Sequence, residues 1–498
     1  MNRKAPALLL LCFLAAASGS RGQVIEGVFV HFGYDAQDNA MPAALLGPYF
    51  AELASIGVGT VVVDQVRART VPGCAGDSSS FKWLPEFPGK LGSILDLAAR
   101  YGMGVYVGLA VTMVSCKEFW DPQKPNAMLA VQDTAATVDA LAGHATHPAF
   151  RGWYIPDEPP ALDESPYPYY ANLVTAIKAR TPGAPVVVAP PLALAAGGCG
   201  GPCAPSALAD KALKFRNATG VDIQAWQDSV GSSATELNQW SRSGSSVEQY
   251  FVGLADALGQ DGLWADVELF TWASSLFQFP GYQPASMSRI NEQLWETRSG
   301  SGGRSAKRVV WLQQYHMSAA YPGRFQGAER LLAAYKAYYG YTGRLLTPMN
   351  YGNYLWETPP SSSYPDPANQ KLFDRHAGDP RDFLQRDWTG VVGTAQVVVD
   401  LGGPQRIDWV AADLLHDPGL GIQVPTQLDV YCANVPGEFA AAPLMSSRPR
   451  TAENGVASAG EYVLGNDLPL AATCRWLRIV LTNPGYWTFL SEVEIIGG

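Results

Sequence analysis

The sequence predicts an α/β protein: a (β/α)8 TIM barrel followed by a C-terminal antiparallel β-sandwich. Three observations lead to this prediction. A β-branched run followed by an amphipathic stretch recurs eight times between residues 24 and about 345. Residues 350–366 are rich in Pro and Ser and lose the helical period. Beyond them, short strands follow at regular spacing with no helical stretch between them, which is typical of a β-sandwich.

The eight predicted barrel strands are apolar on both faces, as expected of a parallel sheet covered by helices. They comprise residues 27–33, 60–66, 104–110, 151–156, 184–190, 221–227, 263–269 and 308–315. Several of the intervening amphipathic stretches end in Gly just before the next strand, as helix C-caps do. Eight such units favour a closed barrel. A doubly wound open sheet is the alternative, but no GxGxxG fingerprint follows the first strand.

The first 22 residues have the pattern of a secretory signal peptide. Arg3 and Lys4 form the charged start, residues 7–17 the apolar core and residues 17–20 a small-residue cleavage region. The apolar run is too short to span a membrane. Cys12 lies inside the apolar core, which argues against a lipoprotein anchor. We therefore expect a secreted or periplasmic protein without a membrane span.

Charge and composition restrict the class of partner. The formal net charge of −10 gives no indication of nucleic acid or of an anionic membrane surface. The 14 Trp and 22 Tyr residues exceed what a core of this size needs. Because Trp side chains in exported proteins often stack on sugars, we expect a carbohydrate partner. We also expect the protein to be a monomer.

The cysteines predict disulfides. Removal of the signal peptide leaves six cysteines, an even number in an oxidising compartment. Six cysteines allow 15 pairings. Proximity favours three of them: Cys74–Cys116, Cys199–Cys203 and Cys432–Cys474. A zinc site at Cys199 and Cys203 is the competing interpretation, but no His accompanies this pair.

The segment RGWYIPDEPP (151–160) places two carboxylates directly after the fourth predicted strand. In a β/α barrel, the C-terminal ends of the strands carry the catalytic groups. Glu158 ends strand four, and Glu268 ends strand seven in an equally apolar setting. Glycoside hydrolysis needs one carboxyl group to protonate the leaving oxygen and another to attack or to activate water. The glutamates therefore predict a glycoside hydrolase; the alternative is an N-cap or a loop salt bridge.

This placement resembles the large clan of retaining barrel glycosidases, whose acid/base ends strand four and whose nucleophile ends strand seven. The resemblance implies that Glu158 is the acid/base and Glu268 the nucleophile. That clan usually has Asn before its acid/base, where this chain has Asp157. An extra anion affects which carboxyl group holds the proton. Asp157 therefore takes the acid role if its side chain, rather than that of Glu158, faces the pocket.

Three motifs resemble a bacterial family of exported barrels, domain of unknown function 4434. They are GVFVHFG (27–33), GWYIPDEP (152–159) and VDIQAWQDSVG (221–231). The resemblance covers roughly residues 24–345. It implies a barrel with glycosidase activity and leaves the sugar, the linkage and the choice of endo or exo action open.

Polar and aromatic residues at the strand ends are the candidates for substrate binding. They are Asp157, Tyr34, His31, Gln65, Trp226, Gln227, Asp228, Trp272, Tyr315 and His316. The tryptophans are candidates for stacking on a pyranose ring, although each alone is more often a core or loop residue. Asp228 is the best candidate, because Gln-Asp-Ser followed by Gly231 has the composition of a loop that fixes polar groups.

No pattern in the sequence indicates a metal or serine hydrolase. His144 and His147 precede strand four, which places them at the opposite end of the barrel. No HExxH occurs, and no GxSxG elbow accompanies a suitably placed His. We therefore expect no metal or cofactor in catalysis. The remaining alternative is a non-catalytic carbohydrate-binding or polysaccharide assembly protein, because a fold does not fix a function.

The C-terminal region resembles the discoidin type of galactose-binding-like modules. The motifs that carry the resemblance are KLFDRHAGD (371–379), VVVDLGGPQRIDWV (397–410) and CRWLRIVLTNPGYWTFLSEVEII (474–496). It implies a carbohydrate-binding module with a structural calcium near Asp374, although Arg375 departs from the usual small residue. The alternative is a sandwich that only packs on the barrel. The expected organisation is a signal peptide (1–22), a barrel (23–349), a linker (350–366) and a sandwich (367–498).

Overall fold

The computed structural model describes the chain from residue 24 onward with several gaps. The described residues are 24–32, 41–69, 82–83, 87–112, 125–159, 164–192, 203–231, 246–272, 282–298, 306–321, 324–341, 345–346, 354–380, 382–384, 387–449 and 460–498. The expected signal peptide and the site candidate Tyr34 lie outside them. Within these ranges, no helix has the length and apolar character to cross a membrane.

Eight parallel strands form a closed barrel, which confirms the predicted fold class. Around the barrel they run β1 (Gly27–Val30), β13 (Lys307–Trp311), β10 (Leu263–Glu268), β9 (Ile223–Gln227), β8 (Val186–Val188), β7 (Phe150–Ile155), β5 (Gly104–Gly108) and β2 (Thr60–Val63). The eighth strand in the sequence is shorter than predicted. It ends at Trp311, and the short helix α10 (Gln313–His316) follows it, after Leu312 adopts a left-handed backbone with φ 51°.

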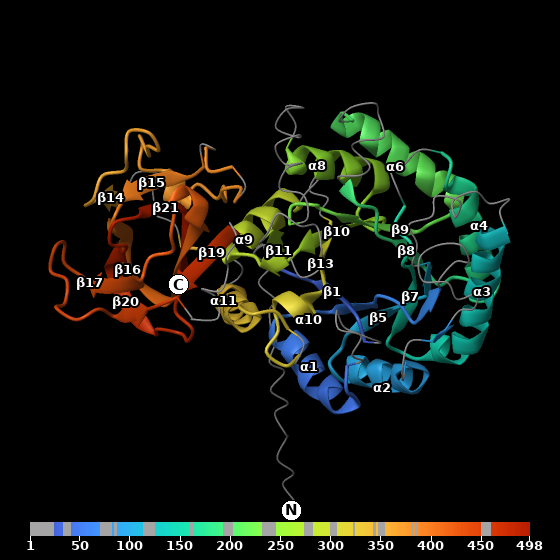
Figure 1. Cartoon of the computed structure of the whole chain (residues 1–498). Helices are drawn as coiled ribbons and strands as arrows, with labels where there is room; N and C mark the ends of the chain where they lie inside the picture. Colours follow the sequence, from blue (N-terminus) through green and yellow to red (C-terminus); the bar gives the residue numbers. More distant parts are fainter. Residues whose placement is uncertain are drawn as a thin grey trace, which may run out of the picture.

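Helices surround the barrel (Figure 1). They are α1 (Ala43–Ser55), α2 (Phe87–Arg100), α3 (Pro125–Leu141), the 3-10 turn η2 (Ala142–Thr146), α4 (Tyr167–Lys178), α6 (Pro205–Thr219), α8 (Val247–Leu258), α9 (Met287–Glu296) and α11 (Ala328–Gly340). The predicted glycine C-caps occur at several of them. Gly220, for example, ends α6 in the left-handed conformation with φ 74°, which a residue without Cβ adopts at little cost.

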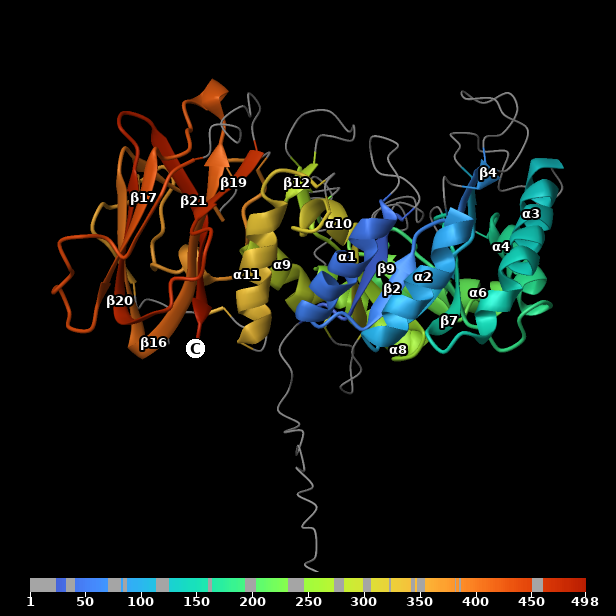
Figure 2. The same ribbon diagram turned by 90° about the horizontal axis from the view of Figure 1, so that it is seen from below.

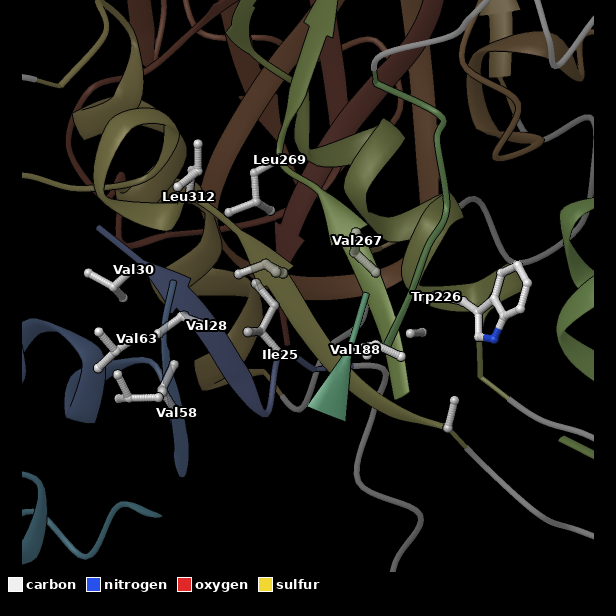
Figure 3. Close-up of a cluster of buried hydrophobic side chains, with 14 of the residues drawn as sticks. Ile25, Val28, Val30, Val58, Val63, Val188, Trp226, Val267, Leu269 and Leu312 are labelled. Carbon is white, nitrogen blue, oxygen red and sulfur yellow. The ribbon is translucent and has the colours of Figure 1, made fainter. Parts of the chain in front are cut away.

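Side chains alternate between the two faces of the barrel wall. Val28 and Val30 point outward into the cluster packed against the helices (Figure 3), whereas Phe29 belongs to the cluster inside the barrel. On β10, Trp264 faces inward, and Asp266 and Glu268 follow it at the two-residue spacing of a strand. Strand β10, the seventh barrel strand in the sequence, therefore directs two carboxylates into the barrel near its C-terminal end.

Two small sheets extend beyond the barrel and were not predicted from the sequence. One contains β3 (Arg67–Arg69), β4 (Lys82–Trp83) and β6 (Ala110–Thr112), and the other pairs β11 (Phe270–Trp272) with β12 (Tyr282–Pro284). Figure 2 shows β4 and β12 on the same side of the barrel. This is the side on which the catalytic loops of a β/α barrel lie, because β3, β6 and β11 directly follow barrel strands.

The C-terminal region forms an antiparallel sheet, as predicted. Its order is β15 (Thr389–Val392), β21 (Trp487–Gly497), β16 (Ala395–His416), β20 (Ala472–Thr482), β17 (Gln427–Ala433) and β18 (Met445–Ser447), with β14 (Tyr354–Trp356) and β19 (Gly460–Gly465) also paired to β16. The 3-10 turns are η5 (Lys371–Phe373) and η6 (Pro418–Leu420). The two strands expected at 395–402 and 407–415 are one strand with a register shift between Asp400 and Gln405.

Within the segment expected as a linker, β14 pairs with β16 and so belongs to the sheet. The disulfide between Cys432 and Cys474 joins β17 to β20, which confirms the third predicted pair. Cys203 is also disulfide-bonded. Its expected partner Cys199, and the predicted pair Cys74–Cys116, lie outside the described residues.

The sandwich lies beside the barrel, with α9 and α11 between them (Figures 1 and 2). Helix α9 is buried on nearly all sides, including at Ser288, Arg289 and Gln293. Both domains therefore contribute to the packing of this helix.

Candidate active site

Glu158 lies at the mouth of the barrel, three residues beyond the end of β7. The residue is exposed to solvent, while the protein around it partly desolvates its carboxyl group. This desolvation raises the pKa of Glu158 to about 7; the hydrogen bond from Gln227 opposes the shift, and repulsion by Asp64 and Asp157 adds to it. Glu158 can therefore carry a proton near neutral pH and deliver it to a group in the mouth.

Asp157 points away from Glu158 and toward helix α4. Its Oδ2 accepts a hydrogen bond of 2.9 Å from the hydroxyl of Tyr169, and its carbonyl oxygen accepts one of 2.8 Å from Tyr170. The side chain is buried. Asp157 thus anchors the end of β7 to α4, while Glu158 is the carboxylate that faces the mouth.

Glu268 is the last residue of β10 and is only 3% exposed. Two side chains bind its backbone. The amide of Glu268 donates to Oδ1 of Asp228 at 3.4 Å, and its carbonyl oxygen accepts from Nε2 of Gln293 at 3.0 Å. Gly231 lies directly against it, because a Cβ on Gly231 would stand 3.1 Å from Cβ of Glu268 and 2.2 Å from the carbonyl oxygen of Phe270. The backbone that carries Glu268 is therefore closely fixed.

A further carboxylate, Asp266, lies two residues before Glu268 on β10 and was not predicted as a site residue. It is fully buried, and within the described part of the chain neither of its carboxylate oxygens has a hydrogen-bond partner. Burial, followed by repulsion from Asp228, Glu268, Glu158 and Asp64, raises the pKa of Asp266 well above its usual range. Asp266 therefore interacts electrostatically with both Glu158 and Glu268. The sequence signal for Asp266 is its two-residue spacing from Glu268, because residues two apart in a strand face the same side.

His31 follows β1 and completes the polar part of the mouth. Its Nε2 is hydrogen-bonded to Oδ2 of Asp64. The amide of His31 donates to Oε1 of Gln314 at 2.9 Å, and Nε2 of Gln314 returns a bond of 2.8 Å to the His31 carbonyl. The hydroxyl of Tyr315 lies 3.4 Å from Nδ1 of His31. The structure thus brings together the predicted residues His31 and Tyr315 from opposite ends of the barrel sequence.

Trp311 at the end of β13 is an aromatic residue that sequence reasoning missed. It is partly exposed, and its ring centroid lies 5.4 Å from that of Phe29 and 6.0 Å from that of His31. It belongs to the cluster inside the barrel, two residues after Val309. Trp311 therefore presents a partly exposed aromatic surface beside His31.

Several predicted site residues lie away from the mouth. Trp226 is fully buried in the outer cluster (Figure 3), with its indole nitrogen 3.1 Å from Oε1 of Gln224. This leaves Trp226 no surface for stacking on a sugar. His316 packs against Phe270 and Phe325, and burial lowers the pKa of His316 to about 3. This imidazole is therefore neutral and part of the core.

Of the remaining predicted residues, one faces the mouth and others are buried in the protein around it. Gln227 faces the mouth, where its Nε2 donates to Glu158 and also to the carbonyl of Ala189 at 3.1 Å. Asp228 is fully buried behind β10, and burial raises its pKa to about 7. Gln65 is buried directly after Asp64. Trp272 is part of β11, and its side chain is not among the described features.

In the described parts of the chain, no three His, Cys, Asp or Glu side chains are arranged to hold a metal ion. At the predicted calcium position, Oδ1 of Asp374 accepts from the amide of His376 at 2.9 Å, and Oε1 of Glu492 accepts from that of Arg375 at 2.9 Å. These oxygens already stabilise the loop through its backbone. A structural calcium beside Asp374 stays a prediction.

The fold and the site define a (β/α)8 barrel whose mouth is lined by carboxylates. The chain belongs to the family described as "Domain of unknown function (DUF4434)", whose profile matches residues 25–317. This match confirms the family resemblance seen in the sequence motifs. A comparison with curated proteins finds no match.

Solved structures with similar arrangements include several carbohydrate-active proteins. A putative alpha-L-fucosidase from Bacteroides thetaiotaomicron matches with a TM-score of 0.46 and 18% identity, over 68% of this chain and 99% of that one. A beta-D-glucuronidase from Dictyoglomus thermophilum matches with a TM-score of 0.36 and 11% identity, over 59% and 45%. A chitosan-binding module from Paenibacillus sp. IK-5 matches with a TM-score of 0.20 and 14% identity, over 31% and 99%.

Proposed function

We propose that this chain is an exported glycoside hydrolase that cleaves an oligosaccharide or polysaccharide, with Glu158 as general acid/base and Glu268 as nucleophile. The observation that carries the proposal is the contrast between the two glutamates. Glu158 is reached by solvent and has a pKa of about 7, whereas Glu268 is buried at the end of a strand whose backbone is held by Asp228 and Gln293. Paired carboxyl groups in different environments are what acid–nucleophile catalysis requires.

In the proposed reaction, Glu268 attacks the anomeric carbon while Glu158 protonates the leaving oxygen. The glycosyl-enzyme ester then reacts with water, from which Glu158 removes a proton. A retaining mechanism of this kind needs carboxyl groups roughly 5–5.5 Å apart, whereas inversion needs about 6.5–9.5 Å. His31, held by Asp64 and Gln314, and Trp311 would contact the sugar beside the reacting bond.

The predicted signal sequence and the disulfide Cys432–Cys474 support export, since disulfides persist in oxidising compartments. We further propose that the C-terminal sandwich binds carbohydrate, on the resemblance of its motifs to discoidin-like modules.

The test is hydrolysis of a polysaccharide array, with new reducing ends as the readout, by the wild type and by Glu158→Gln and Glu268→Ala. We expect the wild type to release reducing ends from at least one polymer and both variants to lose this activity. With an aryl glycoside of the same sugar, azide should restore turnover to Glu268→Ala and yield a glycosyl azide. Near-normal turnover by Glu268→Ala would show that the nucleophile is assigned wrongly. Binding of a polymer without cleavage by the wild type would identify a carbohydrate-binding protein instead.

A further inference from the structure

Helix α9 carries a side chain that connects the backbone of Glu268 to the interface between the two domains. Nε2 of Gln293 donates to the carbonyl of Glu268 at 3.0 Å and to Oδ2 of Asp228 at 2.8 Å. Both partners are acceptors, so the amide nitrogen of Gln293 is the end that faces them. Gln293 is 1% exposed, so these bonds are shielded from solvent.

Asp228 completes the support through its other oxygen. Oδ1 accepts from the amide of Glu268 at 3.4 Å and from the amide of Val230 at 3.1 Å. Both backbone polar groups of Glu268 are therefore bound by the pair of Asp228 and Gln293. The side chain of Glu268 starts from the Cα between these two groups, so its position in the mouth depends on them.

The sandwich in turn fixes the helix that carries Gln293. At the start of α9, the amide of Ser286 donates to Oε1 of Glu461 at 3.1 Å, and the amide of Ser288 donates to Oε1 of Glu494 at 2.9 Å. Arg289 pairs with Glu461 at 2.7 Å. Carboxylates of a second domain thus satisfy free amide groups of the first helical turn, where negative charge is favourable.

We propose that Gln293 is a positioning residue for Glu268, and that the C-terminal sandwich holds α9 in the register that this role requires. This inference rests on the proposed role of Glu268 as nucleophile. Under this proposal, the sandwich supports the active site of the barrel whether or not it binds carbohydrate.

The experiment compares Gln293→Met with Gln224→Met. The control removes another fully buried glutamine, whose Nε2 donates at 2.9 Å to the carbonyl of Ala212 and whose Oε1 accepts from the indole nitrogen of Trp226 at 3.1 Å. Amide hydrogen exchange of the peptide covering residues 263–272 is the first readout, because it requires no substrate. We expect Gln293→Met to raise the exchange rate of this peptide about tenfold and Gln224→Met to leave it unchanged. Equal exchange of the peptide in both variants would overturn the proposal.

The second readout is turnover of 4-nitrophenyl glycosides by the full-length variants. For a glycoside that the wild type hydrolyses, Gln293→Met should lower kcat about 100-fold with little change in KM, because misplacing a reacting group affects the transition state more than binding. A KM effect without a kcat effect would assign Gln293 to substrate binding and overturn the positioning role. If the wild type hydrolyses neither these glycosides nor any polymer of the array while the exchange difference is present, the glycosidase assignment fails and the support of Glu268 by Gln293 stands.

Discussion

Gln227 at the end of β9 donates a hydrogen bond from its Nε2 to Oε1 of Glu158, which follows β7, at a distance of 2.8 Å and across the one intervening strand, β8. The bond stabilises the ionised form of Glu158 and so opposes the desolvation that raises the pKa of this group to about 7. Gln227 therefore limits how far the pKa of Glu158 rises, and with it the pH up to which Glu158 holds the proton that a general acid must deliver.

The first prediction is that Gln227→Leu moves the basic limb of the kcat/KM profile to higher pH. The pKa of Glu158 is raised in the folded protein, so the protonated acid is present below about pH 7 and is lost as pH rises through that value. Without the hydrogen bond, the ionised form is less favoured and the pKa rises further, by about 1 unit. Gln224→Leu serves as the control. A basic limb that does not move would mean that another group limits activity at high pH.

The second prediction separates Asp157 from Glu158. Because Asp157 is bonded to Tyr169 on α4 and not directed to the mouth, Asp157→Asn should retain activity within about tenfold of the wild type. Glu158→Gln should lose about 10²–10⁴-fold on substrates with poor leaving groups. The measurement is kcat/KM of both variants on the same polymer. An equal loss in both would return the acid role to Asp157.

The third prediction concerns Gly231 in the motif VDIQAWQDSVG. An added Cβ would stand 2.2 Å from the carbonyl oxygen of Phe270, so the backbone next to Glu268 must move. We expect Gly231→Ala to lower stability by about 1–3 kcal/mol and to reduce kcat. The control is Gly89→Ala in α2, where a Cβ meets no atom within 4 Å. The measurements are the thermal unfolding and the kcat of the two variants. Equal stability and equal kcat in both variants would contradict the predicted contact.

Much of the fold was predictable because each barrel strand is a compact β-branched run such as TVVV in β2. The alternation of side chains inside such a run also identifies Asp266 and Trp311 once the inward face is known. The location of Trp226 was not predictable, because a Trp at the end of a buried strand is compatible with either face. The role of Asp228 was missed for a related reason: its partner Gln293 lies 65 residues later, on a helix that contacts the other domain.

The fourth prediction tests the cysteines outside the described residues. If all six cysteines of the exported protein are oxidised, the unfolded and unreduced protein should contain no reactive thiol. Peptide mapping without reduction should join Cys74 to Cys116 and Cys199 to Cys203. The pair Cys432–Cys474 provides the internal control, because the structure contains it. Two free thiols per chain would show that one of the two remaining pairs does not form.

The last prediction is that the sandwich and the barrel are energetically coupled through the ion pair of Arg289 and Glu461. Each side chain is at most 2% exposed, and the nitrogen and oxygen are 2.7 Å apart. Removing one partner of a buried ion pair leaves the other charge desolvated, at a cost of about 3–5 kcal/mol. Asp413 and Glu292 also interact favourably with Arg289, so we expect Glu461→Gln to lie near the lower end of this range.

A matched control for this variant is Glu357→Gln, which breaks the more exposed pair of Arg478 and Glu357 at 2.8 Å. Such a pair contributes about 0–1 kcal/mol. Urea unfolding of the full chain, followed by both Trp fluorescence and circular dichroism, measures the two free energies of unfolding. If the domains are coupled as the structure indicates, Glu461→Gln should also uncouple their transitions, since α9 loses its partner in the sandwich. Equal effects of the two variants would mean that the interface does not hold α9, and the support of Glu268 would then come from the barrel alone.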